Sequence, residues 1–378
     1  MRDTYLPYGT QSIDDQDIEA VVKVMKSDYL TTGPAVEEFE KSIANYVNAK
    51  YAVAFTNGTA ALHGACFVAG IMHGDEVITT PMTFAASANC VLYQGGKVVF
   101  ADIEESTYNI NPLEIEKQIT NNTKAIIPVH FTGQPANLDE IHRIAKKHNL
   151  MVIEDAAHAI GATYKGRKIG GLSDMTMFSF HPVKHITTGE GGIITTNNEL
   201  YYKKLIQFRS HGITRDSLIL DENHGPWYYE MQFLGFNYRM TDLQAALGTS
   251  QMKKIDSFIN RRKEIIKKYN RAFQTNPDII IPFQSVDGES SWHLYIIQVK
   301  KNRKEVYEAL HAKNIGVNVH YIPVHTLPYY KELGYEKNSM PIAENLYENI
   351  LSLPLFPGMN EQDVLDVIQA VEEVLSTK

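Results

Sequence analysis

The residue best suited to chemistry is Lys184, which follows the apolar residues 178–180 and precedes the glycine-rich residues 189–192. An amine held at a strand end, beside hydroxyl and backbone N–H groups, can form a Schiff base with a phosphate-bearing aldehyde. A lysine taken at random is usually a solvated surface residue. The small and hydroxylic neighbours of Lys184, among them Ser179 and Thr187, favour the reactive amine instead.

A carboxylate follows a second apolar run, where Asp155 comes after residues 150–154 and precedes two alanines and His158. Short apolar runs bounded by loops are typical of buried parallel strands, and ligands bind at the carboxyl ends of such strands. A buried carboxylate needs a cationic partner, and a protonated pyridine nitrogen would serve. Taken alone, Asp155 could equally cap a helix N-terminus.

A third element is the run Asn57-Gly58-Thr59, which indicates a strand, a tight turn and the start of a helix. Free N–H groups and the dipole at a helix N-terminus attract phosphate, and the Thr59 hydroxyl can assist. An ordinary capped helix has the same signature. Along the chain, a phosphate-binding helix start, a carboxylate partner for a pyridine nitrogen and a reactive amine follow one another. Together they favour a site for a phosphorylated pyridine aldehyde.

Strand-like and helix-like segments alternate over the first 240 residues or so, the pattern of a mostly parallel sheet with helices on both faces. The expected strands are residues 52–55, 76–79, 97–101, 125–129, 151–154, 175–180 and 192–195, with helices at 139–148 and 200–209. Beyond Thr241, helical spacing from 243 to 269 predicts one long helix. A strand at 292–299, a helix at 304–313, a strand at 316–321 and a helix at 362–375 predict a small α+β domain. We expect a large domain over 1–245 and a small one over 246–378.

Composition excludes several classes of protein. The 378 residues can bury a sizeable core, and 36 basic against 44 acidic residues without a basic block do not suggest nucleic-acid binding. No apolar stretch has transmembrane length and no signal-peptide core follows the first residues, so no membrane association and a cytoplasmic location are expected. Cys66 and Cys90 lie in apolar settings as reduced core residues. His181, His185 and His211 have no acidic or cysteine partner at ligand spacing, so no metal is expected.

The sequence resembles the DegT/DnrJ/EryC1/StrS sugar aminotransferases, which use pyridoxal phosphate on the fold type I scaffold. The resemblance runs from about Tyr8 to the final helix. Within this family the sequence is most similar to the branch of the pseudaminic acid pathway. Enzymes of that branch use glutamate to aminate C4 of UDP-2-acetamido-2,6-dideoxy-β-L-arabino-hex-4-ulose. The matching stretches are residues 57–62, 80–84, 154–159, 178–184, 189–192, 209–212 and 234–242, with 320–323 favouring the pseudaminic branch.

The resemblance implies a large seven-stranded, mostly parallel sheet domain, a smaller α+β C-terminal domain, and residues 1–30 packing with the small domain. Lys184 would carry pyridoxal phosphate as a Schiff base and later serve as general base and acid. Asp155 would pair with the pyridinium, His158 would reach the ring 3′-oxygen and Phe84 would stack on the ring. The phosphate would be bound by Thr59, Ala60 and Ser179, and by Asn237 from the partner of a C2 homodimer.

The resemblance also implies contacts to a UDP-keto-sugar, and L-glutamate or 2-oxoglutarate as the other substrate. The residues that would contact the nucleotide sugar or line its cleft are Tyr8, Asp28, Tyr29, Leu30, Thr31, Asn57, Asn237, His320, Tyr321, Ile322 and Pro323. Arg239 and His325 could bind the diphosphate or the donor carboxylate. A surface ion pair and a core histidine explain these two residues at least as well.

Other functions stay open at this point. A 3-aminotransferase or an enzyme of spore-coat polysaccharide synthesis would carry the same motifs. In the sugar dehydratase branch of the family a histidine replaces the lysine, and Lys184 argues against that branch. A non-catalytic binding module would be expected to have lost Lys184, Asp155 or Ser179, and all of them are present.

Overall fold

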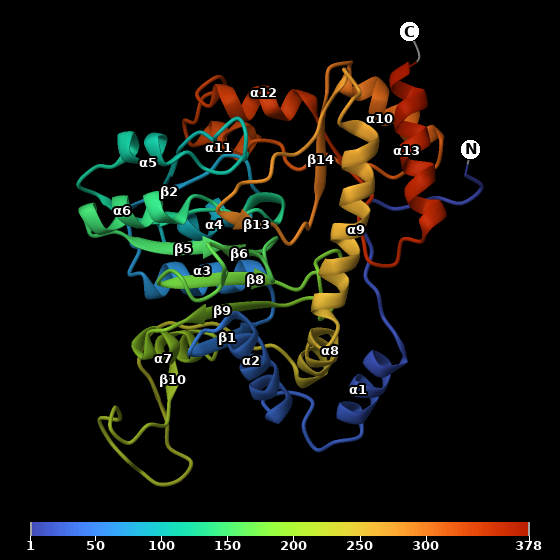
Figure 1. Cartoon of the computed structure of the whole chain (residues 1–378). Coiled ribbons are helices and arrows are strands. Elements are labelled where there is room, and N and C mark those ends of the chain that lie inside the picture. The colour runs from blue at the N-terminus through green and yellow to red at the C-terminus, as the bar shows by residue number, and fades with distance from the viewer. Residues whose placement is uncertain (1, 377–378) are drawn as a thin grey trace.

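The computed structural model describes residues 2–376, and a seven-stranded sheet forms its centre (Figure 1). The strand order is β1-β9-β8-β5-β4-β2-β3, and β9 alone runs antiparallel to its neighbours. The strands are β1 (Tyr51–Phe55), β2 (Glu76–Thr79), β3 (Lys97–Phe100), β4 (Thr123–Ile127), β5 (Met151–Asp155), β8 (Met175–Ser179) and β9 (Gly192–Thr196). The seven strands expected for the large sheet therefore exist, with ends displaced by at most two residues.

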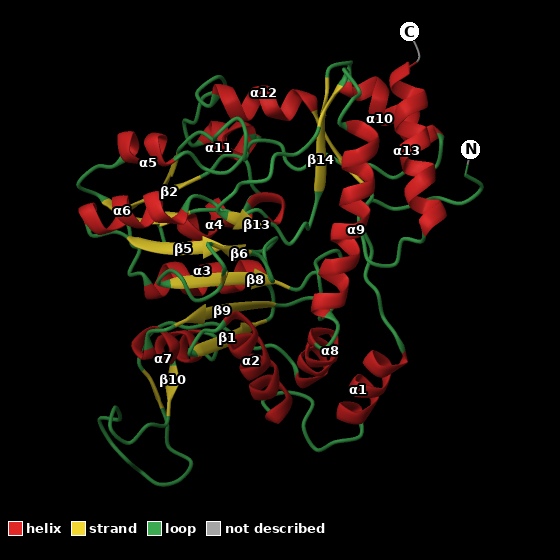
Figure 2. Cartoon of the chain, in the orientation of Figure 1, coloured by secondary structure: helices red, strands yellow, loops and turns green. Residues whose placement is uncertain are grey.

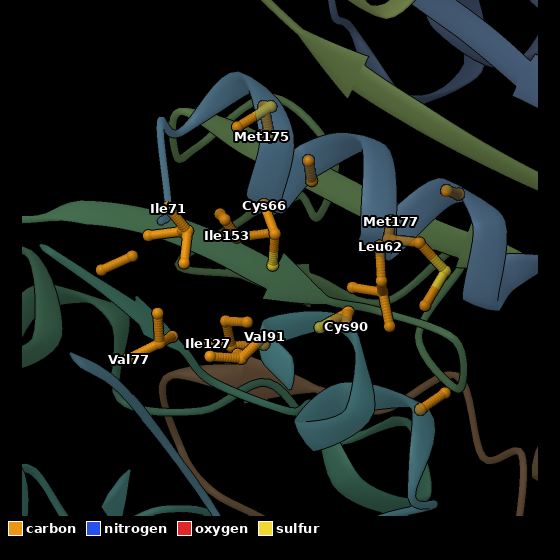
Figure 3. Packing of buried hydrophobic residues seen from close by; sticks show 14 of the residues in the cluster. Leu62, Cys66, Ile71, Val77, Cys90, Val91, Ile127, Ile153, Met175 and Met177 are labelled. Atoms are coloured by element: carbon orange, nitrogen blue, oxygen red, sulfur yellow. The ribbon is translucent and has the colours of Figure 1, made fainter. Parts of the chain in front are cut away.

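Helices cover both faces of this sheet because its strands are apolar on both sides (Figure 2). On one face α3 (Gly58–Val68) and α4 (Ala86–Tyr93) bury Leu62, Cys66, Cys90 and Val91 against the sheet (Figure 3). On the other face α2 (Pro34–Val47) and α6 (Leu138–His148) pack on the alternate side chains of the same strands. The parallel strands thus end together at one edge, between two helical layers.

A smaller antiparallel sheet lies beside the large one, with the order β12 (Ile279–Ile280), β14 (Tyr295–Val299) and β15 (Ile350–Leu353). Three helices, α9 (Ile255–Phe273), α10 (Arg303–Ala312) and α13 (Glu361–Ser376), share its apolar core. Leu6 joins this core and exchanges backbone hydrogen bonds with Asn314 and Gly316. The chain around Leu6 therefore packs with the smaller sheet.

The remaining helices and strands lie outside these two sheets. They are α1 (Asp15–Met25), α5 (Pro112–Gln118), α7 (Glu199–Phe208), α8 (Asp242–Met252), α11 (Pro328–Glu332), α12 (Pro341–Asn349), β6 (Thr163–Tyr164), β7 (Arg167–Lys168), β10 (Ile213–Thr214), β11 (Glu230–Met231) and β13 (Gly288–Glu289), with 3₁₀ turns at Phe131–Gly133 and Val324–Thr326. Over residues 2–376, none of the helices combines the length and apolar character needed to span a bilayer.

Two expected elements differ from the structure. The single helix expected over 243–269 is divided into α8 and α9 by a turn at residues 253–254, where the Lys254 ammonium pairs with Asp17 of α1 at 2.6 Å. The strand expected over 316–321 is reduced to one isolated bridge between Asn318 and Ser352, because the Gly316 N–H donates to the Leu6 carbonyl instead.

Candidate active site

A cavity of about 850 Å³ lies where Asp155 ends β5, Ser179 ends β8 and Asn57 follows β1. The carboxyl ends of parallel strands are the usual ligand-binding edge of such sheets. Residues that precede or follow β14 close the cavity from the smaller sheet. The lining residues are Tyr8, Asn57, Gly58, Thr59, Ala60, Leu62, Thr83, Phe84, Ala86, Tyr93, Val129, Asp155, Ala157, His158, Met177, Ser179, His181, Val183, Lys184, Glu190, Tyr238, His293, Asn318, Val319, His320 and Tyr321.

The N-terminus of α3 opens into this cavity. Asn57 is its N-cap, and the Asn57 Oδ1 accepts a 2.8 Å hydrogen bond from the Ala60 N–H. The N–H groups of Gly58 and Thr59 have no acceptor among residues 2–376. Free amides at the positive end of a helix form an anion site, and the Ser179 hydroxyl lies close to Gly58. This end of the cavity suits a phosphate group.

Gly192 explains why a strand can lie directly against the start of that helix. A Cβ atom at Gly192 would stand 2.5 Å from the Asn57 carbonyl oxygen and 2.6 Å from the Gly58 Cα. Real Cβ atoms do not approach other atoms so closely, so only glycine fits here. The second glycine of the pair Gly191-Gly192 thus sets the position of the anion site relative to the sheet.

Asp155 is a buried carboxylate that is only partly satisfied. Its side chain accepts a 2.6 Å hydrogen bond from the Ser87 hydroxyl at Oδ2 and one of 3.0 Å from the Ala157 N–H at Oδ1. Burial raises the pKa of Asp155, while the bonds from Ser87 and Ala157 and the charge of Lys184 oppose that rise. No cationic side chain of the described residues pairs with it, so the carboxylate is free to accept a charged donor from the cavity.

Lys184 follows β8, with its backbone N–H bonded to the His181 carbonyl. Its Nζ lies 3.5 Å from the Nε2 of His293. Burial lowers the pKa of Lys184 to about 8, although the carboxylate of Asp155 acts in the opposite direction. About one tenth of this amine is therefore neutral and nucleophilic at pH 7, far more than for a lysine of ordinary pKa.

His158 and Phe84 complete the wall around the lysine. The Nε2 of His158 lies 3.1 Å from the Tyr321 hydroxyl, while its buried Nδ1 has no partner among the described residues. Burial holds the pKa of His158 well below its ordinary value, so the ring is neutral. The Phe84 side chain lines the cavity yet is 62% exposed, which leaves an aromatic face open to a ligand.

Four of the residues expected to contact a sugar line the same cavity. Tyr8, Asn57, His320 and Tyr321 all line the cavity, and the rings of Tyr8 and His320 lie 5.2 Å apart. The Nδ1 of His320 lies 2.8 Å from the Ser352 hydroxyl, which fixes the ring. The structure thus brings these four residues together.

Other expected contacts lie outside this chain's cavity. His325 is fully buried, with its Nε2 3.0 Å from Glu344, and corresponds to the core-histidine interpretation. Arg239 and the buried Pro323 do not line the cavity, and neither does Ile322, which is half exposed. Likewise exposed and away from the cavity are Asp28, Tyr29, Leu30, Thr31 and Asn237.

Sequence reasoning missed several groups in or behind the cavity wall. Ser87 bonds Asp155 from a helix that begins inside an alanine-rich run, and no motif marked it. His293 falls in one expected strand and Asn318 in another, and neither position predicts a role in the site. Only the fold, which places the smaller sheet opposite β8, brings His293 and Asn318 to the cavity.

The sheet order, the reversed β9, and a lysine and an aspartate that face one cavity define a class of protein. They are the features of the fold type I transferases that depend on pyridoxal phosphate. The family model for the DegT/DnrJ/EryC1/StrS aminotransferase family matches residues 11–372. The chain therefore belongs to the DegT/DnrJ/EryC1/StrS aminotransferases, which use pyridoxal phosphate.

Known proteins are similar over almost the whole length. The spore coat polysaccharide biosynthesis protein SpsC of Bacillus subtilis is 45% identical, over 99% of this chain and 98% of the relative. The UDP-4-amino-4,6-dideoxy-N-acetyl-beta-L-altrosamine transaminase of Campylobacter jejuni is 38% identical, over 98% and 97%.

Two solved structures have the same fold. One is Helicobacter pylori PseC, an aminotransferase of pseudaminic acid biosynthesis, with a TM-score of 0.93, 32% identity, and 99% and 100% of the two chains covered. The other is the putative sugar aminotransferase Spr1654 of Streptococcus pneumoniae in its PMP form, also with a TM-score of 0.93 and 32% identity, over 98% and 99%.

Proposed function

We propose that this chain transfers the amino group of L-glutamate to C4 of a UDP-4-keto-6-deoxy-N-acetylhexosamine, with Lys184 as the residue that holds the cofactor. The observation that carries the proposal is the convergence of Lys184, Asp155 and the N-terminus of α3 on one cavity. Each of these groups has unused bonding capacity. A phosphorylated pyridine aldehyde offers a partner to each.

The fit can be judged group by group. The free amides of Gly58 and Thr59 suit the cofactor phosphate, assisted by the Ser179 hydroxyl. The half-satisfied carboxylate of Asp155 suits a protonated pyridine nitrogen. The unpartnered Nδ1 of His158 and the open face of Phe84 suit the ring itself. These residues therefore fit pyridoxal phosphate, and Ala60, whose N–H is already bonded to Asn57, lines the same helix end.

When bound, pyridoxal phosphate supplies the site for the migrating amino group and withdraws electrons from the substrate carbon. Lys184 would hold the cofactor covalently and, once released, take and return a proton at the substrate carbon. An amine with a lowered pKa suits both directions of proton transfer near neutral pH. The negative charge of Asp155 would keep the pyridine nitrogen protonated.

The second subunit has a place in this proposal. Asn237 and the segment from Asp28 to Thr31 are exposed and do not line the cavity of their own chain. The cofactor and sugar contacts that the family resemblance assigns to them therefore require a second copy. A closed C2 homodimer with shared sites meets that requirement.

The identity of the sugar substrate is inferred from the relatives of the chain. Similarity to the Campylobacter jejuni transaminase and to PseC supports amination at C4 of a UDP-linked sugar of the pseudaminic type. The second candidate is a sugar of a spore-coat-type polysaccharide, which the higher identity to SpsC favours.

Product analysis separates these candidates. The purified enzyme would be incubated with glutamate and UDP-4-keto-6-deoxy-N-acetylhexosamines of the L-arabino and D-xylo configurations, with dTDP-3-keto sugars as a third set. The proposal expects C4 amination and preference for the L-arabino sugar. Equal turnover of the two UDP sugars, or preference for a dTDP-3-keto sugar, would overturn the pseudaminic assignment.

A further inference from the structure

His293 lies directly against the amine of Lys184. The two residues lie in loops next to different sheets: Lys184 follows β8 of the large sheet, and His293 precedes β14 of the smaller sheet. The Nε2 of His293 lies 3.5 Å from the Lys184 Nζ, and that nitrogen has no other side-chain hydrogen-bond partner among residues 2–376. Such contacts are often long in a ligand-free site and shorten when the site is filled.

The turn that carries His293 is fixed by buried groups. The Arg262 Nη1 donates to the carbonyls of Trp292, His293 and Leu355 at 3.3, 3.1 and 2.8 Å. The Nε2 of His185 lies 2.9 Å from the carbonyl oxygen of Ser291.

The same turn is also tied to the large sheet's side of the cavity. The His293 N–H donates to the Thr132 carbonyl at 2.8 Å, and the Ser291 hydroxyl donates to the His158 carbonyl at 3.1 Å. Trp292 adopts a left-handed backbone with φ of +56°, which the surrounding bonds must hold. Because the backbone of residues 291–293 is held by these hydrogen bonds, the position of the His293 imidazole is fixed.

The imidazole of His293 is neutral in this setting. It is buried, and the groups that face it are Lys184, His158 at 4.4 Å between ring centroids, His185 at 5.6 Å, and Arg262. None of them is a carboxylate. Burial, together with the positive charges of Lys184 and Arg262, holds the pKa of His293 well below its ordinary value. Its Nδ1 has no partner among the described residues, so one ring nitrogen is free to carry the proton while Nε2 accepts.

We propose that His293 is a positioning residue for Lys184: its Nε2 accepts a hydrogen bond from the ε-amine and holds that nitrogen in the cavity. A lysine side chain has four flexible carbons, and a single directional contact restricts its choice of rotamers. This inference rests on the proposed function only in taking Lys184 as the reacting amine.

The contact has a measurable consequence. A hydrogen bond accepted from the ammonium stabilises the charged form, and therefore offsets part of the lowering of the Lys184 pKa by burial. The other titratable groups that face the amine are Asp155, His158, His185 and His320. Because these stay in place when His293 alone is changed, a shift in titration reports on the His293 contact.

Two amide variants make a matched pair. In His293→Gln the side-chain amide reaches about as far as Nε2, whereas in His293→Asn it reaches only about as far as Nδ1. Lys184 in the full-length, cofactor-free protein would be labelled with acetic anhydride at a series of pH values and quantified by peptide mass spectrometry. We expect midpoints near pH 8 for the wild type and His293→Gln. For His293→Asn we expect a midpoint lower by about half a pH unit or more.

One midpoint shared by all three proteins, or equal shifts in His293→Gln and His293→Asn, would overturn the proposal. If His293→Asn does not fold, His293→Phe keeps an aromatic ring without a nitrogen and should show the same downward shift. His142→Gln alters a histidine bonded to Ser173 outside the cavity and should leave the midpoint unchanged. The labelling uses neither sugar nor cofactor, so a failure of sugar turnover with the Gln–Asn difference intact would count against the proposed function alone.

Discussion

Ser87 and Asp155, 68 residues apart in the sequence, are joined by a 2.6 Å hydrogen bond from the serine hydroxyl to Oδ2 of the carboxylate. Ser87 lies in the first turn of α4 and Asp155 ends β5, so the bond ties a covering helix to the edge of the sheet. The Asp155 carboxylate, which we assign to the pyridine nitrogen, is thus oriented by a hydroxyl of the covering helix. Its charge state depends on this hydroxyl.

Ser87→Ala should weaken pyridoxal phosphate binding roughly tenfold at neutral pH, the effect of losing one hydrogen bond to a charged group. The bond favours the carboxylate, so its loss raises the pKa of Asp155 further. Affinity should consequently fall at a higher pH in the variant than in the wild type as the solution is acidified. Spectroscopic titration of the cofactor between pH 5 and 8 measures both effects. Ser42→Ala is the control, because it removes a hydroxyl that donates to the Phe39 carbonyl away from the site. A pH profile of cofactor affinity for Ser87→Ala that coincides with the wild-type profile would contradict this role of Ser87.

Gly192→Ala should damage the phosphate site. The new methyl group would meet the Asn57 carbonyl at 2.5 Å and must push β9 and the start of α3 apart. Overpacking of this kind costs about 1–3 kcal/mol of stability, and the displaced amides of α3 should bind the cofactor phosphate poorly. Denaturant unfolding and cofactor titration check the two effects. In Gly358→Ala the nearest contact of the new methyl group would be 3.6 Å, so that control variant should resemble the wild type. Unchanged cofactor affinity in Gly192→Ala would show that the close contact between β9 and the start of α3 does not shape the phosphate site.

His325→Ala should reduce stability and leave substrate binding alone. The buried imidazole lies 3.0 Å from the Glu344 carboxylate, and its removal takes one hydrogen-bond partner from a partly buried acid, at a cost of about 1–3 kcal/mol. Thermal unfolding and the KM for the keto-sugar test the two halves of this statement. An increase in KM without loss of stability would instead support the anion contact expected from the sequence.

Much of the architecture could be predicted from the sequence because its signals are local. The strands of the large sheet are short apolar runs between turns, and each was located to within two residues. The division of the long helix at residues 253–254 could not be predicted, since neither glycine nor proline marks it and Lys254 instead bonds Asp17 of a distant helix. The bridge that replaces the expected strand at 316–321 likewise depends on Leu6.

The same distinction applies to the site. Lys184, Asp155 and Asn57 lie in recognisable runs at strand ends, and the structure places all of them on one cavity. His293 carries no such signal, because only the packing of the small sheet against the large one brings it to the lysine. His325 shows the opposite case, in which a chemically suitable residue is used in the core.

Hybrid dimers test the shared site. Lys184→Ala and Asn237→Ala proteins should each be impaired, and mixing them after reversible dissociation should restore about a quarter of wild-type activity, since half of the dimers would contain one intact site. Recovery requires that Asn237 acts in the partner's cavity. Mixtures no more active than their components would show that Asn237 acts within its own chain or not at all.

The most direct test concerns the bond between cofactor and protein. The enzyme loaded with pyridoxal phosphate would be reduced with borohydride, digested and mapped by mass spectrometry, with Lys184→Ala treated in parallel. The account predicts a phosphopyridoxyl group on Lys184, and none on the folded variant. A label on another residue, or no label on the wild-type protein, would contradict it.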